Sequence, residues 1–540
     1  MKIKKESKSK TGKKKATKSK VVKKESLEKK LYKAAEQQRG KVAPSDYKDI
    51  ALGLLFIKFI SYWYDQRRAE IEIETKDSSA QERNYLLNLK KNYSQHGVFF
   101  LKKDDRWVDI KKSVSSEPNL AIKIDKILQQ IEKDNPSLEN VLPNVFANAE
   151  IKNDNLKALI EDFDDIPENE ISKDTFGKVY EYFLKMFHKK SGEKGGEFFT
   201  PKSIVELLVE ILEPYNGIIY DPTCGSGGMF VQSYKFLEEH KINEQQSLAP
   251  YGIESRPDIW RICKMNLALR GINSNNIVGP LDCLIDHPLE DLKANYILAN
   301  PPFKVKEWGH DKLKNDVRFA KYGTPSNSKP GGDYAFMSHM IYHLDENNGK
   351  LGLVLDNGSM AGSDKQESQI RKKIVEDDLI DCIIELPRGL FFTVAIPACI
   401  WVINKNKDDK KSRKRNGETL FINASKHFTP IDRKQNEFSP KQLEKIIETY
   451  RSFIGKKDYP KYRNIPGYCK AVKIKDIKKY DFALTPARYV GVEVIKNNEE
   501  SFQKKIERLS EEYNKLIEQN KKIDKKIYEN LRGLGFEIQD

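Results

Sequence analysis

One stretch decides the fold of this chain: Tyr296-Ile297-Leu298-Ala299-Asn300-Pro301-Pro302-Phe303. The four residues at its start predict a buried strand. Because proline has no N–H to donate to a neighbouring strand, the backbone must leave the sheet at this point. We therefore expect Asn300 and Phe303 at the carboxyl end of the strand, the edge at which open α/β sheets bind ligands.

Two interpretations of this turn remain open. The amide of Asn300, the carbonyl of Pro301 and the ring of Phe303 are the groups needed to hold an exocyclic amino group and stack on its base. Alternatively, Asn-Pro is an ordinary turn and Phe303 covers a hydrophobic core. The stretch alone favours the ordinary turn, so the choice depends on the rest of the chain.

Seven strand-like apolar runs alternate with helical stretches between Gly217 and Asn404. This alternation predicts an α/β, Rossmann-like fold with a mixed, mostly parallel seven-stranded sheet and helices on both faces. The runs are 218–220, 251–253, 277–278, 296–299, 351–355, 380–386 and 399–403.

The segments outside these runs differ in composition and in hydrophobic pattern. Residues 166–490 are expected to form the α/β domain with a C-terminal extension, and residues 26–165 predict an all-helical domain. The first 25 residues predict a disordered, lysine-rich tail. Residues 1–30 hold 14 Lys, 3 Glu and neither Arg nor Asp, so +11 of the formal charge of +15 lies there. The remaining residues carry only +4. The tail can attract phosphates non-specifically, but it is no evidence for specific DNA reading.

Residues 491–540 predict a coiled-coil helix for partner binding. A heptad seam is interrupted by the polar residue Asn520, a pattern that fixes the register and number of paired helices. An amphipathic helix packed on its own domain is the alternative, which we favour less. The seam residues are Phe502, Ile506, Leu509, Tyr513, Leu516, Ile523 and Ile527.

The cysteines and hydropathy exclude several classes of protein. The six cysteines form no C-x-x-C pair and no His cluster lies near them in sequence, so we expect neither a metal site nor a disulfide scaffold, which fits a reducing cytoplasm. No apolar run approaches the ~18–20 residues that cross a bilayer. The lysine tail has no apolar segment behind it, so it is not a secretory signal. We expect a cytoplasmic protein without membrane contact.

Polar and small residues follow the first three runs. The loop Asp221-Pro222-Thr223-Cys224-Gly225-Ser226-Gly227-Gly228 lets a ligand approach the backbone, and the next helix offers free N–H groups. It matches neither the NTPase loop nor the dinucleotide fingerprint. Glu254, after the second run, can accept hydrogen bonds from a ribose diol. Asp282, after the third, can accept one from an adenine amino group. Each alone also has an ordinary explanation as a turn or surface residue.

The segment Glu197-Phe198-Phe199-Thr200-Pro201-Lys202 precedes the sheet. Thr200 is a candidate N-cap and Pro201 suits the first helical position. The N–H groups of this cap can bind a carboxylate, and the two phenylalanines can flank apolar parts of a ligand. All these features converge on the switch point between the first and fourth strands, where a nucleoside-type cofactor would meet an amino-bearing base.

Two motifs carry a family resemblance. Asp221 to Phe230 and Asn300 to Phe303 resemble the cofactor and catalytic motifs of S-adenosylmethionine-dependent N6-adenine DNA methyltransferases. With residues 197–202 ahead of both, their order resembles the gamma arrangement. More narrowly, Leu31 to Ala35 and Leu386 to Phe391 resemble the methylation (M) subunit of type I restriction–modification enzymes. The chain departs from the usual Gly-Asp of the family at Pro280-Leu281-Asp282.

The resemblance implies a mechanism and partners. S-adenosylmethionine would bind residues 197–202, the glycine loop, Glu254 and Asp282. Asn300, Pro301, Pro302 and Phe303 would present N6 of an adenine flipped out of double-stranded DNA. The implied partners are a DNA-specificity subunit, a second M subunit and an ATP-dependent restriction subunit. Nothing between Asn404 and the heptads has a recognition-helix or zinc-finger pattern, so a partner is expected to read the DNA sequence.

Other functions remain open from the sequence. They are a stand-alone N6-adenine DNA methyltransferase, a methyltransferase for an amide or RNA amino group, and an inactive scaffold that binds nucleic acid through its tail. The glycine- and proline-containing segment 304–332 either closes over the flipped base or is a surface loop.

Overall fold

The computed structural model describes residues 26–40, 42–166, 177–183, 186, 200–242, 248–327, 331–391, 397–409, 412–432, 435–492 and 502–533. The predicted tail, residues 1–25, lies outside these ranges, and so do Glu197, Phe198 and Phe199. In the described part, no helix is long and apolar enough to cross a membrane.

The N-terminal helices share one hydrophobic core. The long helix α2 (Pro44–Glu74) contributes buried residues along much of its length. Gly53 lets it pack closely, because a Cβ there would lie 2.9 Å from Pro143 Cγ. The core includes Ile259 and Ile262 of α12 (Pro257–Ala268), so it continues into the α/β part. The other helices here are α1 (Leu27–Gln38), α3 (Ala80–Asn88), α4 (Lys91–Ser94), α5 (Trp107–Ser113), α6 (Leu120–Asp134) and α7 (Asn153–Asp164).

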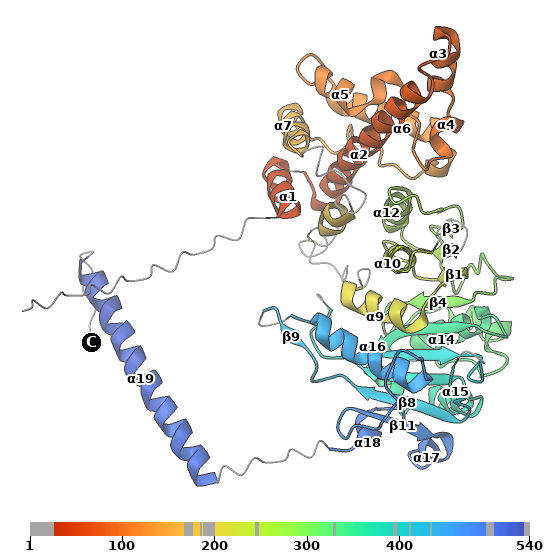
Figure 1. Cartoon of the computed structure of the whole chain (residues 1–540), viewed down its shortest axis with the longest axis vertical. Coiled ribbons are helices and arrows are strands. Elements are labelled where there is room, and N and C mark those ends of the chain that lie inside the picture. Colours follow the sequence, from red (N-terminus) through yellow and green to blue (C-terminus); the bar gives the residue numbers. More distant parts are fainter. Residues whose placement is uncertain are drawn as a thin grey trace, which may run out of the picture. The chain divides into compact units, whose positions relative to one another are not determined.

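In the described residues, nine strands form one mixed sheet in the order β11-β8-β6-β7-β5-β4-β1-β2-β3 (Figure 1). Neighbours from β5 to β3 are parallel, whereas β7 is antiparallel to both β5 and β6. The switch point of the strand order lies between β1 and β4, as predicted. The bounds are β1 (Gly217–Asp221), β2 (Leu248–Ile253), β3 (Ile277–Val278), β4 (Tyr296–Ala299), β5 (Lys350–Asp356), β6 (Ile380–Glu385), β7 (Ala398–Asn404), β8 (Glu418–Asn423) and β11 (Cys469–Lys473).

All seven predicted runs are strands of this sheet, and the mixed α/β fold class is confirmed. The predicted strand number is too small, because β8 and β11 extend the sheet beyond β6. The edge strand β11 exposes Lys470 and Lys473, which is common at sheet edges and weakens the apolar signal in the sequence. A separate two-stranded hairpin joins β9 (Thr429–Pro430) and β10 (Asn436–Glu437).

Helices cover both faces of the sheet. A Cβ on Gly352 of β5 would lie 2.8 Å from Leu208 of α9 (Lys202–Leu212). Its neighbours Leu351 and Leu353 point the other way, into the core formed with α14 (Gly331–His343). α10 (Gly228–Glu239) and α16 (Pro440–Ile454) pack beside α9, and α15 (Lys365–Glu376) packs beside α14 (Figure 1).

The segment 304–332 has both buried and exposed residues. Its described part contains α13 (His310–Leu313) and η5 (Val317–Phe319), and Trp308 and Tyr322 are buried in the same core as α14. These aromatic rings anchor the segment, but many of its other residues are exposed, so the surface-loop interpretation stays a prediction. Closure over a base also stays a prediction.

The described residues after Val490, together with Pro466–Tyr468, group apart from the rest of the chain. The helix α19 (Phe502–Gly533) spans the predicted heptads without a break. Six seam residues, Ile506, Leu509, Tyr513, Leu516, Ile523 and Ile527, are 45% to 65% exposed. Its pairing with another helix and the domain boundaries after residues 25, 165 and 490 stay predictions.

Candidate active site

A cleft with about 910 Å³ of empty space opens at the carboxyl ends of β1, β2 and β4. It brings together ten of the predicted site residues: Thr200, Asp221, Thr223, Gly225, Ser226, Gly228, Glu254, Asp282, Asn300 and Pro302. Pro201, Lys202, Gly227, Pro301 and Phe303 are described but are not part of its lining.

The glycine loop after β1 has a backbone that favours glycine. Gly225 and Gly227 have φ of 53° and 80°, and a Cβ on Gly227 would lie 3.0 Å from Cys263 Sγ. Asp221 accepts a hydrogen bond from the backbone N–H of Thr223 (3.0 Å). Burial raises the pKa of Asp221 to about 8. The loop is therefore tightly turned around a buried carboxyl group at the floor of the cleft.

Glu254 connects the loop after β1 to the end of β2. It is 4% exposed, and its carboxylate accepts hydrogen bonds from the backbone N–H groups of Gly225 (3.0 Å) and Arg256 (2.9 Å). Burial raises its pKa, and the backbone hydrogen bonds oppose that rise. Each of these carboxylate oxygens retains a lone pair that can accept from a ligand.

Asn300 is the most unusual polar group of the cleft. Its Nδ2 donates to Thr200 Oγ1 (3.0 Å), whereas its buried Oδ1 has no partner among the described residues. The predicted N-cap role of Thr200 is wrong: α9 begins at Lys202 with Pro201 as its cap residue. The hydroxyl of Thr200 instead fixes the orientation of the Asn300 amide.

Phe303 lies beside the cleft. Its ring packs edge-to-face on Phe391, with centroids 5.9 Å apart and an interplanar angle of 79°. The side chain is partly buried by this and neighbouring contacts. The rings of Phe303 and Phe391 therefore form an aromatic wall next to the Asn300 turn.

The cleft also contains side chains that the sequence did not single out. Val305 follows the Asn300–Phe303 turn, the predicted catalytic turn, and Phe336 comes from α14. Because α14 is buried on nearly all sides, its sequence has no amphipathic pattern to mark Phe336. Asp282 lines the cleft, but its Oδ1 accepts from the backbone N–H groups of Leu284 (2.8 Å) and Ile285 (3.0 Å), so it also shapes its own turn.

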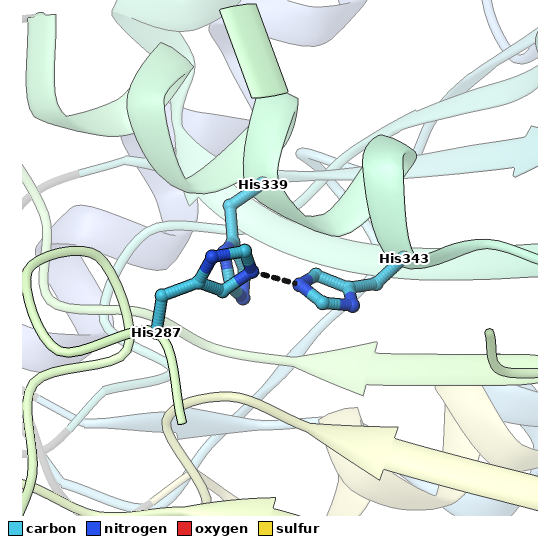
Figure 2. A group of neighbouring side chains, drawn as sticks. All are labelled: His287, His339 and His343. Atoms are coloured by element: carbon cyan, nitrogen blue, oxygen red, sulfur yellow. Dashed lines mark hydrogen bonds between the residues drawn. The ribbon is translucent and has the colours of Figure 1, made fainter. Parts of the chain in front are cut away.

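Three of the eight histidines gather in one cluster: His339 and His343 on α14, and His287 after β3 (Figure 2). His343 Nδ1 donates to the carbonyl of Leu292 (2.8 Å), because a carbonyl can only accept. Its Nε2 is therefore an acceptor, and His287 Nε2 donates to it (3.0 Å; Figure 2).

The protonation of His339 is decided by Arg318. A guanidinium can only donate, so His339 Nδ1 accepts from Arg318 Nη1 (2.9 Å) and Nε2 carries the proton toward the Tyr220 hydroxyl (3.0 Å). Burial lowers the pKa of His343 to about 4 and that of His339 well below its usual value. A metal on His339 Nε2 would require a proton on Nδ1, facing Arg318. We therefore interpret the cluster as a neutral hydrogen-bond network.

Comparison with known proteins identifies the family. The N-6 DNA methylase family matches residues 171–498, and the HsdM N-terminal domain matches residues 27–163. The type I restriction enzyme MjaIX methylase subunit of Methanocaldococcus jannaschii is 35% identical over 520 residues, covering 94% of this chain and 91% of that protein. The chain belongs to the methylase subunits of type I restriction enzymes. This methylase subunit is an adenine-specific DNA methyltransferase, which resolves the choice between DNA and an RNA or amide substrate.

A second methylase subunit supports the same family, and a solved structure supports the fold. The HindI methylase subunit of Haemophilus influenzae is 39% identical over 424 residues, covering 77% of this chain and 92% of that protein. The type I restriction-modification methyltransferase subunit from Streptococcus thermophilus shares the fold, with a TM-score of 0.71 over 86% of this chain and 99% of that chain, at 23% identity.

Proposed function

We propose that this methylase subunit binds S-adenosylmethionine in the cleft and methylates N6 of an adenine flipped out of double-stranded DNA. The observation that carries this proposal is the buried Oδ1 of Asn300, which has no partner among the described residues. A buried acceptor without a donor costs about 1–3 kcal/mol. The amino group of adenine supplies that donor.

The cofactor half of the cleft fits the nucleoside part of S-adenosylmethionine. Glu254 lines the cleft with oxygens that can accept from a ribose diol, and the turned backbone at Gly225 lets a ligand approach closely. Asp282 borders the same space. The bound cofactor supplies a methyl group carried on a sulfonium. The role of residues 197–202 in cofactor binding rests on the family resemblance, supported for Thr200 by its place in the lining.

The catalytic turn presents the amino group. The lone pair of adenine N6 is delocalised into the ring, so N6 is a poor nucleophile. Asn300 Oδ1 and the Pro301 carbonyl would accept its two hydrogens and direct the lone pair toward the methyl group. The aromatic wall that includes Phe303 would stack on the base. Positioning of this kind contributes up to ~7–11 kcal/mol to catalysis, and base flipping is required because N6 is inaccessible in a duplex.

We expect partner subunits to supply the recognition of the DNA sequence and the restriction activity. A DNA-specificity subunit would choose the sequence, with a second methylase subunit and an ATP-dependent restriction subunit completing the complex. The exposed seam of α19 supports such assembly, because isolated amphipathic helices bury their apolar face against a partner. Deleting residues 500–540 should abolish co-purification with the specificity subunit while the dissociation constant for S-adenosylmethionine changes less than about twofold.

One experiment tests the function. The chain is purified alone and with its neighbouring gene products, incubated with unmethylated DNA and S-adenosylmethionine, and the methylated adenines are mapped. We expect methylation at one sequence and only with the specificity subunit. Methylation by the chain alone would favour the stand-alone enzyme, and absence of N6-methyladenine in both samples would contradict the proposal.

A further inference from the structure

The residue that follows the catalytic turn is held at its main chain and at its side chain. Lys304 has φ of 55°, in the left-handed region that side chains rarely adopt. Its backbone N–H donates to Asp333 Oδ1 (2.9 Å), and its Nζ pairs with Asp356 Oδ2 (3.2 Å). The end of the Asn300–Phe303 turn is therefore set by contacts from α14 and from the end of β5.

The N-terminus of α14 packs directly on this backbone. A Cβ on Gly332 would lie 2.6 Å from the carbonyl oxygen of Val305 and 3.2 Å from its nitrogen. Asp333 comes next and is 1% exposed. Phe336, one helical turn later on the same face, lines the cleft together with Val305. Asp333 is thus located where α14 meets the catalytic turn.

A structural role at the helix start explains only one oxygen of Asp333. Oδ1 is satisfied by Lys304, but Oδ2 is buried and has no partner among the described residues. Burial raises the pKa of Asp333 to about 7, and the neighbouring carboxylate of Asp356 adds to the rise. Retaining a half-satisfied buried carboxyl group is costly for stability. Such costs concentrate where geometry serves function.

We propose that Asp333 is a positioning residue for methyl transfer: by holding the Lys304 N–H it sets the Asn300–Phe303 turn against the target adenine. This inference rests on the proposed role of Asn300. Asp333 acts through the turn and need not touch the substrate or the cofactor.

The test compares Asp333→Ala and Asp333→Asn in the complex with the specificity subunit, on DNA that carries the mapped site. Because a 1 Å misplacement costs roughly 100-fold, Asp333→Ala should lower kcat by about 30- to 100-fold. The KM for DNA and the dissociation constant for S-adenosylmethionine, measured by calorimetry, should change less than about twofold. Asp333→Asn keeps an oxygen that accepts from Lys304 and should retain at least about a fifth of kcat.

A matched control is Asp345→Ala. Asp345 also accepts from backbone N–H groups, those of Asn347 (3.1 Å) and Asn348 (2.8 Å), but it precedes β5, at the sheet edge opposite the cleft. Its loss should leave kcat unchanged. If Asp333→Ala fails to bind S-adenosylmethionine because it does not fold, Asp333→Ser replaces it, since a serine hydroxyl is too short to reach Lys304 in the same way.

Three results overturn the inference. The first is that Asp333→Ala or Asp333→Ser keeps more than half of wild-type kcat, and the second is that Asp333→Asn is as inactive as Asp333→Ala. The third is that the affinity for S-adenosylmethionine falls as much as kcat. The proposed function fails separately, if wild-type protein forms no N6-methyladenine or if Asn300→Ala methylates normally. If Asp333→Ala methylates DNA at the wild-type rate while Asn300→Ala is inactive, only the positioning role of Asp333 is rejected.

Discussion

The two halves of the cleft treat their polar atoms differently. In the cofactor half, the carboxylates of Asp221 and Glu254 already accept from backbone N–H groups of the chain itself. In the half proposed for the base, Asn300 Oδ1 has no donor among the described residues, and neither has Oδ2 of Asp333, which lies outside the lining of the cleft. The carboxylates of the proposed cofactor half are thus already held by the chain itself, whereas the Asn300 acceptor of the proposed base half has no donor yet among the described residues. This difference predicts that substitutions in the two halves affect different constants.

The largest effect is expected for Asn300→Ala. It removes the acceptor that orients N6, so methylation should fall at least about 100-fold, the size seen when one group that stabilises a transition state is lost. Cofactor affinity should change less than twofold. Single-turnover rates with labelled S-adenosylmethionine and calorimetry measure the two quantities. Asn348→Ala, in an exposed turn, is the control. Normal methylation by Asn300→Ala would contradict the proposal that the two halves of the cleft control different constants.

Glu254→Ala should change the dissociation constant for S-adenosylmethionine rather than the methylation rate. Loss of a buried carboxylate that holds Gly225 and accepts from a ligand is worth about 1.5–3 kcal/mol, so the dissociation constant for S-adenosylmethionine should rise about 10- to 100-fold. At saturating cofactor, kcat should recover most of its wild-type value. Glu239→Ala on the exposed end of α10 serves as the control. An unchanged dissociation constant would mean that the second strand does not hold the cofactor.

The pH dependence of cofactor binding sharpens the comparison further. In the free protein the pKa of Asp221 is about 8, above its usual value, so the carboxyl group is mostly protonated at pH 6 to 7. A bound sulfonium and ammonium favour the carboxylate, so binding lowers this pKa and releases a proton. Affinity should therefore rise by up to about tenfold per pH unit and level off above pH 8. Asp221→Asn should bind with no such slope, and a flat profile in the wild type would exclude this coupling.

The smallest effect is expected where the two halves meet. Thr200→Ala removes the acceptor of Asn300 Nδ2 and leaves the amide free to rotate. A net hydrogen bond of about 0.5–1.5 kcal/mol corresponds to a 2- to 10-fold loss of kcat. Thr200→Ser should restore the rate. Equal rates for Thr200→Ala and wild type would show that packing alone orients the amide.

The sequence predicted local features well and long-range pairs poorly. Asn300 at the end of β4 and Glu254 at the end of β2 follow from strand runs that stop at turn residues. The Thr200–Asn300 bond joins positions 100 residues apart, and Thr200 was assigned instead to the nearest helix because Ser/Thr before a helix usually caps it. Phe336 and β11 were missed for a related reason: a helix buried all round and a lysine-bearing edge strand both lack the periodicity that marks their neighbours.

If Asn300 Oδ1, which has no partner among the described residues, accepts from the amino group of the target base as proposed, it also discriminates among bases. A guanine or thymine in the same place would point a carbonyl oxygen at it, setting two acceptors face to face, and the loss of the expected donor is penalised strongly at a site built to bind one. Adenine and cytosine both offer an amino group, so only the size of the space between the catalytic turn and the cofactor separates them. On the proposed mechanism, selection against keto bases would lie in one amide of this chain, whatever sequence the proposed partner chooses.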